Sequence, residues 1–230
     1  MPSKYEIYDN HAKEYDELVN HEDYQNNLTA FLQRECAGFD TVLEFGAGTG
    51  RVTGLYADRV GHIFFAERAQ HMIDRAAENL AAHQDKITFI NIDTRDLAGL
   101  NIKADCIIEG WALGHTAIDE HHRLADFLSE LFTGFRSLLN VNGRLIFIET
   151  MGSHVDQPVV PRKELAYLYR ELETTYRMKR HILETDYKFA SVEEARRIMG
   201  FFFGQEMAAS IDSEVVREYT GVWVGALNPA

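Results

Sequence analysis

The sequence predicts an α/β fold with a doubly wound, mainly parallel sheet. Short apolar segments typical of buried strands alternate with amphipathic helix patterns through most of the 230 residues. A turn with three glycines follows the first strand pattern, and acidic residues stand at the ends of several strand patterns. No linker rich in Pro, Gly or Ser separates these segments, so we expect residues 1–230 to form a single domain.

The first part of the chain contains five strand patterns and three helix patterns. The helices are marked by apolar side chains that recur every three or four residues, such as Leu124, Phe127, Leu128 and Leu131. Because strands that alternate with helices are joined by right-handed crossovers, we expect these strands to run parallel. The predicted strands are residues 41–45, 62–66, 88–92, 104–108 and 144–149, and the predicted helices are residues 24–35, 69–82 and 124–138.

The pattern changes after Thr150. Residues 152–161 are typical of a loop, and residues 162–180 have the apolar spacing of one long helix. We interpret residues 151–190 as a helical insertion after the fifth strand that covers a substrate site. A solvated helix face and a dimer contact are alternative roles for the same helix.

Two further elements are predicted towards the C-terminus. Ser191 is followed three residues later by Glu194, which is the capping-box signature of a helix start. Residues 219–226 have the composition of a last strand. Both elements are compatible with the single-domain α/β prediction.

The most informative segment is the turn that follows the first strand. Residues 42–50 read Val-Leu-Glu-Phe-Gly-Ala-Gly-Thr-Gly, with an acid at Glu44. Glycines let a backbone approach a ligand closely, and a helix that begins near Arg51 would direct its first N–H groups at that ligand. The dinucleotide-binding signature Gly-x-Gly-x-x-Gly requires glycine where Arg51 stands. The spacing therefore disfavours a nicotinamide or flavin protein, which stays open as an alternative.

This segment resembles the first motif of class I S-adenosylmethionine-dependent methyltransferases, of the type that acts on small molecules. Residues 8–16 are similar to the family's N-terminal segment Tyr-x(n)-Ala-x-x-Tyr-Asp. The resemblance covers residues 5–149 well and residues 191–225 more loosely. It implies a Rossmann-like fold, S-adenosylmethionine as cofactor, and an N-terminal helical lid over residues 1–36. It also implies that a tyrosine closes over the cofactor, with Tyr15 the first candidate and Tyr8 the second.

Acidic residues after successive strands complete the expected cofactor site, because ligands of open α/β sheets bind beyond the carboxyl ends of the strands. Glu67 can accept hydrogen bonds from both hydroxyls of a ribose, although aspartate is commoner there in the family. By resemblance, Asp93 binds the adenine amino group, and the backbone of residues 109–111 faces the sulfonium. The expected cofactor-binding residues are Tyr15, Glu44, Gly46, Ala47, Gly48, Gly50, Glu67, Arg68, Asp93, Thr94, Glu109, Gly110 and Trp111.

Methyl transfer from a sulfonium is an in-line displacement, in which the protein aligns the acceptor and removes a proton where the acceptor requires it. His115 follows the fourth strand and is the candidate general base. His121 and His122 are adjacent, which is poor spacing for metal ligands, and we expect no metal site. The expected substrate-binding residues are Trp111, His115, His154 and Tyr169.

Composition narrows the class of partner. The formal net charge of −13 disfavours nucleic acid, although a local basic patch remains compatible with RNA. The sequence Glu-Gly-Trp-Ala at residues 109–112 replaces the Asn/Asp-Pro-Pro-Tyr signature of enzymes that methylate nucleobase or glutamine nitrogens. We therefore expect a small-molecule acceptor with an oxygen or nitrogen nucleophile. An NAD(P)-dependent oxidoreductase and a non-catalytic S-adenosylmethionine-binding protein are the alternatives.

The compartment is inferred from the cysteines and the N-terminus. Only Cys36 and Cys106 are present, and Cys106 lies in a predicted buried strand, so a disulfide framework is not expected. The N-terminal residues are polar and acidic, and no segment is apolar for long enough to span a bilayer. These features predict a cytoplasmic protein without a membrane segment.

Overall fold

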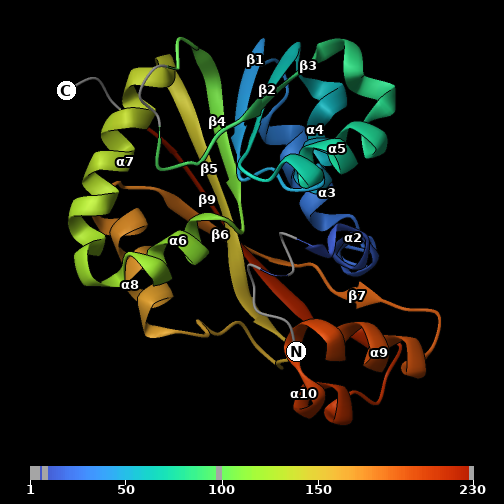
Figure 1. Cartoon of the computed structure of the whole chain (residues 1–230). Helices are drawn as coiled ribbons and strands as arrows, with labels where there is room; N and C mark the ends of the chain where they lie inside the picture. Colours follow the sequence, from blue (N-terminus) through green and yellow to red (C-terminus); the bar gives the residue numbers. More distant parts are fainter. Residues whose placement is uncertain (1–5, 7–9, 97–99, 228–230) are drawn as a thin grey trace.

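The computed structural model describes residues 6, 10–96 and 100–227. Its centre is a seven-stranded sheet with the order β3-β2-β1-β4-β5-β9-β6 (Figure 1). Strands β1 to β5 are parallel, and β9 is antiparallel to both β5 and β6. The fold class is therefore confirmed as a doubly wound, mainly parallel sheet. The strands are β1 (Thr41–Phe45), β2 (His62–Glu67), β3 (Ile87–Asn91), β4 (Ala104–Gly110), β5 (Leu139–Ser153), β6 (Lys179–Glu184) and β9 (Glu218–Ala226).

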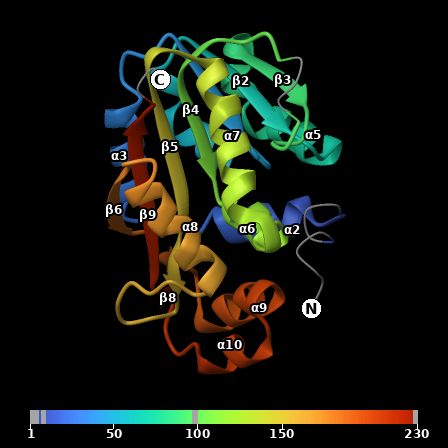
Figure 2. The same cartoon turned by 90° about the vertical axis from the view of Figure 1, so that its left-hand side faces the viewer.

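Helices cover both faces of the sheet (Figures 1 and 2). Alternate residues of each strand enter opposite cores, so Val42 packs with α3, α4 and α5, whereas Leu43 packs with α6, α7 and α8. One face carries α3 (Asn27–Glu35), α4 (Arg51–Tyr56), α5 (Gln70–Asn79) and the short helices η1 (Ala57–Arg59) and η2 (Ala81–Lys86). The other carries α6 (Leu113–Asp119), η3 (His121–Arg123), α7 (Leu124–Leu138) and α8 (Lys163–Thr174).

The glycines of the turn after β1 are required by its backbone. Gly46, Gly48 and Gly50 have φ angles of 61°, 57° and 84°, a region that other residues rarely adopt. A Cβ on Gly46 would lie 2.3 Å from the Cβ of Ala112, so the turn also lies directly against the end of β4. The conformation brings backbone N–H groups to the carboxyl edge of the sheet.

The expected helical insertion over residues 151–190 is not present in that form. Helix α8 ends at Thr174, earlier than predicted, and packs in the helix layer beside α6. The chain then forms strand β6, which pairs with β9 and completes the sheet. Both elements belong to the basic α/β layout. The predicted helix is therefore present over Lys163–Thr174, but it does not extend to residue 180 and is not an insertion.

The additional elements come after β6 instead. Strands β7 (Tyr187–Lys188) and β8 (Val215–Val216) form a two-stranded sheet, and helices α9 (Val192–Phe203) and α10 (Gln205–Ser210) lie between them in sequence. Together with α2 (Ala12–Val19) they enclose a separate apolar cluster. We call α2 and residues 187–216 the cap. The cap lies beyond the carboxyl ends of the parallel strands (Figure 1).

The predicted capping box begins α9. The Ser191 hydroxyl accepts a hydrogen bond from the Glu194 N–H at 3.2 Å, and Oε2 of Glu194 accepts one from the Ala190 N–H at 2.7 Å. Both cysteines are free and buried. Within the described residues, no helix combines the length and apolarity needed to cross a membrane.

Candidate active site

Two adjoining cavities lie at the carboxyl edge of the sheet, beneath the cap. The glycine-turn cavity is lined by the turn after β1 and by the ends of β2, β3 and β4. The cap cavity lies beside it and has a volume of about 510 Å³. Ten of the predicted site residues line the glycine-turn cavity, namely Tyr15, Gly46, Gly48, Glu67, Arg68, Asp93, Thr94, Gly110, Trp111 and His115.

Glu67 is fixed by the backbone on both sides. Its Oε2 accepts a hydrogen bond from the Gly48 N–H at 3.0 Å, and its Oε1 accepts one from the Ala69 N–H at 2.9 Å. The residue is only 7% exposed and still lines the cavity. Each carboxylate oxygen can accept more than one hydrogen bond, so Glu67 retains acceptor capacity for a ligand.

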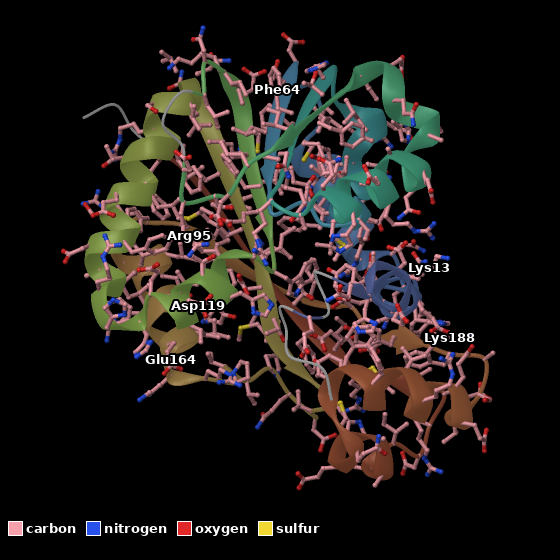
Figure 3. All side chains as sticks on the ribbon, viewed as in Figure 1. Lys13, Phe64, Arg95, Asp119, Glu164 and Lys188 are labelled. Atoms are coloured by element: carbon pink, nitrogen blue, oxygen red, sulfur yellow. The ribbon has the colours of Figure 1, made fainter. Side chains whose placement is uncertain are left out.

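Asp93 is paired with a residue that the sequence analysis did not single out. Its Oδ2 lies 2.6 Å from the Arg95 guanidinium, and its Oδ1 accepts a hydrogen bond from the Arg95 N–H at 2.9 Å. These bonds to Arg95 hold the pKa of Asp93 below its usual value. Arg95 and Asp119, both labelled in Figure 3, also line the cavity. Asp93 is therefore an ionised acceptor at this edge.

Trp111 separates the two cavities and lines both. It adopts a left-handed backbone conformation with φ 54°, and its N–H donates to the Ile148 carbonyl at 2.7 Å. The Arg51 guanidinium lies 4.3 Å from the centre of its ring, and Arg51 in turn pairs with Glu22 at 2.7 Å. These contacts fix the indole as a rigid wall.

Four of the predicted cofactor-binding residues do not line either cavity. Ala47 and Gly50 shape the turn, since the Gly50 N–H donates to the Ala47 carbonyl at 2.9 Å. The Glu44 carboxylate is directed towards α4, where its Oε2 accepts hydrogen bonds from the hydroxyls of Thr53 and Tyr56 at 2.8 and 2.7 Å. Burial raises the pKa of Glu44 to about 7. The prediction that the Glu44 side chain contacts the cofactor is therefore wrong. The carboxylate instead holds α4 against the sheet.

Glu109 is the fourth such residue. It is 1% exposed, and neither carboxylate oxygen has a hydrogen-bond partner in the described part of the chain. Burial, with the nearby carboxylates of Glu149 and Asp93, raises the pKa of Glu109 well above its usual value. Its side chain is a buried acid whose neutral form is favoured, and only the adjacent Gly110 and Trp111 line the cavity.

Comparison with known proteins identifies the domain. Residues 42–133 match the family model described as a methyltransferase domain. Residues 42–133 therefore form a methyltransferase domain. Such domains take the methyl group from S-adenosylmethionine, so the enzyme class and the cofactor that the sequence predicted are both confirmed. A search of curated proteins by sequence finds no match.

Solved structures, two of them described as methyltransferases, share the fold at low identity. A precorrin 8W decarboxylase of Methanobacterium thermoautotrophicum has a TM-score of 0.56 and 16% identity, covering 87% of this chain and 89% of its own. The N-methyltransferase NodS of Bradyrhizobium japonicum, solved with S-adenosyl-L-homocysteine, has a TM-score of 0.53 and 12% identity over 96% and 100% of the two chains. PH1948 of Pyrococcus horikoshii, described as a candidate RNA methyltransferase, has a TM-score of 0.53 and 13% identity over 88% and 83%.

The donor set of the glycine-turn cavity fits S-adenosylmethionine. The glycine turn leaves open space, because a Cβ on Gly48 would meet only Tyr15, at 3.9 Å. Glu67 and Asp93 provide carboxylates at the ends of β2 and β3. Burial raises the pKa of Tyr15 to about 12, so its hydroxyl stays protonated. Tyr8, the second lid candidate, lies outside the described residues.

The predicted acceptor residues of this methyltransferase separate into two groups. Trp111 and His115 line both cavities, and His115 lies on α6 directly after Gly114. Tyr169 is 2% exposed, packs 4.4 Å from the Trp223 ring and donates to the Thr150 carbonyl at 2.8 Å. It is a core residue, so its assignment to the acceptor site was wrong. His154 is half-buried and lines neither cavity.

The cap cavity contains acidic residues that the sequence analysis missed. Glu22, Glu149 and Glu218 line it, together with apolar residues of the cap. Glu149 ends the predicted fifth strand, and Glu218 precedes the predicted last strand. Because β9 is antiparallel, its first residue lies at the same edge as the last residues of the parallel strands. The strand-end rule that found Glu67 would have found both, had it been applied to β5 and to the start of β9.

Proposed function

We propose that the protein transfers the methyl group of S-adenosylmethionine to a small-molecule acceptor by in-line displacement. The observation that carries this proposal is the contact between the two cavities, which share Tyr15, Trp111 and His115. A cavity of about 510 Å³ is the size of a small-molecule site.

The glycine-turn cavity would hold the cofactor through residues of four elements. Glu67 accepts hydrogen bonds from the ribose hydroxyls, and Asp93 and Thr94 lie at the adenine end. The turn at Gly46 and Gly48 provides backbone close to the amino-acid portion. When bound, S-adenosylmethionine supplies an electrophilic methyl group. Gly110 and Trp111 form the wall between the acceptor and this methyl group.

His115 is the proposed general base. It lies at the junction of the two cavities, where a proton must leave the acceptor as the new bond to carbon forms. A correctly placed base contributes a rate factor of roughly 10²–10⁴. Trp111 holds the acceptor against this junction. His154 and Tyr169 have no role in this proposal.

The acceptor would be enclosed by the described part of the predicted N-terminal lid (residues 10–36 of 1–36), by the first residues of α8 and by the cap. Tyr15, Leu18 and Glu22 line the cap cavity from the lid, and Pro161 and Leu165 line it from residues 151–190. The covering role of both segments is thus retained as a proposal, although their elements differ from those predicted. The dimer contact and the cytoplasmic location stay predictions.

Two alternatives are less well supported. A non-catalytic S-adenosylmethionine-binding protein would need no acceptor cavity beside Trp111 and His115, and this chain has one. An RNA acceptor finds some support in the fold shared with PH1948, but many acceptor types share this fold. The net charge of −13 opposes binding to a phosphate backbone.

The class of acceptor can be tested with methyl-labelled S-adenosylmethionine. The purified protein would be incubated with either the ultrafiltered small-molecule fraction or the RNA and protein fraction of a cell extract. We expect label to enter the filterable fraction only, and incorporation into RNA or protein would overturn the proposal. In the same assay, His115→Ala should lower turnover by roughly 10²-fold or more. Its affinity for S-adenosyl-L-homocysteine, measured by calorimetry, should fall by less.

A further inference from the structure

The cap cavity is lined by three carboxylates that are almost completely buried. The side chain of Glu22 is 3% exposed, and Glu149 and Glu218 are 3% and 2% exposed. They come from three separate segments, the chain after α2, the end of β5 and the start of β9. Buried carboxylates without compensating partners are costly, so their hydrogen bonds and ion pairs need to be accounted for one by one.

Two of these carboxylates have an oxygen without a partner. Oε2 of Glu22 pairs with Arg51 at 2.7 Å, whereas Oε1 of Glu22 is buried and unpartnered among the described residues. Oε1 of Glu218 accepts the Thr150 hydroxyl at 3.1 Å, and the Ser153 hydroxyl also acts on this carboxylate and lowers its pKa. Oε2 of Glu218 is buried and has no hydrogen bond of regular geometry in the same ranges. Such atoms call for a hydrogen-bond donor from a ligand.

Glu149 is held in place beside Gly114, the residue that precedes His115 on α6. One oxygen, Oε1, accepts a hydrogen bond from the Gly114 N–H. The carboxylate lies so close to Gly114 that a Cβ there would be 2.5 Å from Oε2 of Glu149. Glu149 therefore lies next to His115, the proposed base.

The cations that line the cavity form no ion pair with Glu149 or Glu218 in the described part of the chain, although the charge of Arg51 opposes the rise in the pKa of Glu218. Arg51 forms its ion pair with Glu22, and Arg162 is exposed at the start of α8. Within the described residues, neither Glu149 nor Glu218 forms an ion pair. The other titratable groups that line the cavity are Tyr15, Tyr187 and His115. Burial raises the pKa of both Glu149 and Glu218 to about 8, which is the expected effect of a carboxylate without a counter-ion.

Apart from Thr150 and Ser153 beside the carboxylates, most of the remaining side chains that line the cavity are apolar. Leu18 contributes from α2, Ile118 from α6, Leu165 from α8, and Phe202 from α9. These side chains suit a hydrocarbon or aromatic body, whereas the carboxylates suit a group that donates several hydrogen bonds and carries positive charge. A cationic acceptor would favour the ionised form of Glu149 and Glu218 and offset the cost of burying that charge, which neither an anionic acceptor nor a neutral alcohol would do.

We propose that the acceptor is an amine with an apolar body, and that Glu149 and Glu218 bind its ammonium group. This inference rests on the proposed function. One proton passes from the bound ammonium to His115, which leaves a neutral nitrogen. That nitrogen forms a bond to the methyl carbon as the carbon–sulfur bond breaks. The electron pair remains on sulfur, and the products are the methylated amine and S-adenosyl-L-homocysteine.

Binding is tested with probes that share one apolar body and differ in charge. Calorimetry on the protein saturated with S-adenosyl-L-homocysteine would use 2-phenylethylamine, 2-phenylethanol and 3-phenylpropanoate, with benzylamine and hexylamine as further amines. We expect amines alone to bind. Equal binding of the alcohol or the carboxylate, or no binding of any amine at millimolar concentration, would overturn the proposal.

Variants locate the binding site. Glu149→Gln and Glu218→Gln should each weaken amine binding about tenfold or more, with unchanged affinity for S-adenosyl-L-homocysteine. Glu206→Gln is the matched control, because Glu206 lies on α10 of the cap and is exposed. Equal amine affinity in all three variants would overturn the proposal. The methyl-label experiment distinguishes failure of this inference from failure of the proposed function. If small molecules become labelled but no amine binds, the amine inference is wrong and the proposed methyl transfer still stands.

Discussion

Glu67 illustrates how a single carboxylate can be fixed before any ligand arrives. Its two oxygens already accept backbone hydrogen bonds from Gly48 and Ala69, one on either side of the end of β2. The position of the carboxylate is therefore set by the glycine turn and by the chain that leads into α5. A ligand that donates to Glu67 does not have to order the side chain, which lowers the entropic cost of binding.

Substitution of Glu67 tests the ribose assignment. Glu67→Ala should weaken S-adenosyl-L-homocysteine binding by roughly 10- to 100-fold, because hydrogen bonds to a charged group contribute about 1.5–3 kcal/mol. Isothermal titration calorimetry measures the change. Glu44→Gln is the control, since Glu44 is also a strand-end acid but bonds to Thr53 and Tyr56. The assignment is wrong if the two variants lose the same affinity.

The sequence identified strand-end acids but not their directions. Glu44 and Glu109 lie one residue before the ends of β1 and β4, so the strand pleat turns their side chains into the helix layers. Glu67 is the last residue of β2 and reaches the edge. Glu149 also reaches it, because β4 pairs with β5 only as far as Ile148. Exact strand ends decide these directions, and strand ends are the least certain part of a sequence prediction.

At the scale of elements, strand β6 is the feature that the sequence pattern did not predict. It is the edge strand of the sheet, and it carries Lys179, Arg180 and Glu184 on exposed positions. Charged residues are common on edge strands because they prevent pairing with other chains, and they also remove the apolar signal of a strand. The break between α8 and β6 is marked by Arg177, whose φ is 54°. No sequence pattern predicts a left-handed backbone conformation at an arginine.

The helix start at Ser191 was predicted correctly, and it allows a test of the cap. Ser191→Ala removes the hydrogen bond to the Glu194 N–H and should destabilise the protein by about 1 kcal/mol. Urea unfolding measures the change in free energy. Ser129→Ala is the control, because Ser129 is exposed within α7. A loss in the control as large as in Ser191→Ala would contradict the capping role.

At the scale of the whole molecule, the protein buries several acids in a chain of net charge −13. Burial is the largest cause that raises the pKa of each: Glu44 to about 7, Glu149 and Glu218 to about 8, and Glu109 well above its usual value. In the unfolded chain these groups ionise near pH 4.3, roughly. The unfolded state therefore releases protons that the folded state retains, and stability must fall as the pH rises.

We expect the free energy of unfolding to decrease from about pH 4.5 up to about pH 8, where Glu149 and Glu218 ionise in the folded state as well. Glu109→Gln removes one contributor without removing a hydrogen bond, since neither of its oxygens has a partner within the described ranges. The variant should match the parent protein at the acid end and exceed its stability at the alkaline end. Urea unfolding across the pH range measures both slopes. If the unfolding free energies of the variant and the parent protein change with pH at the same slope, Glu109 ionises in the folded protein as readily as in the unfolded chain. Another group would then have to relieve its repulsion with Glu149 and Asp93.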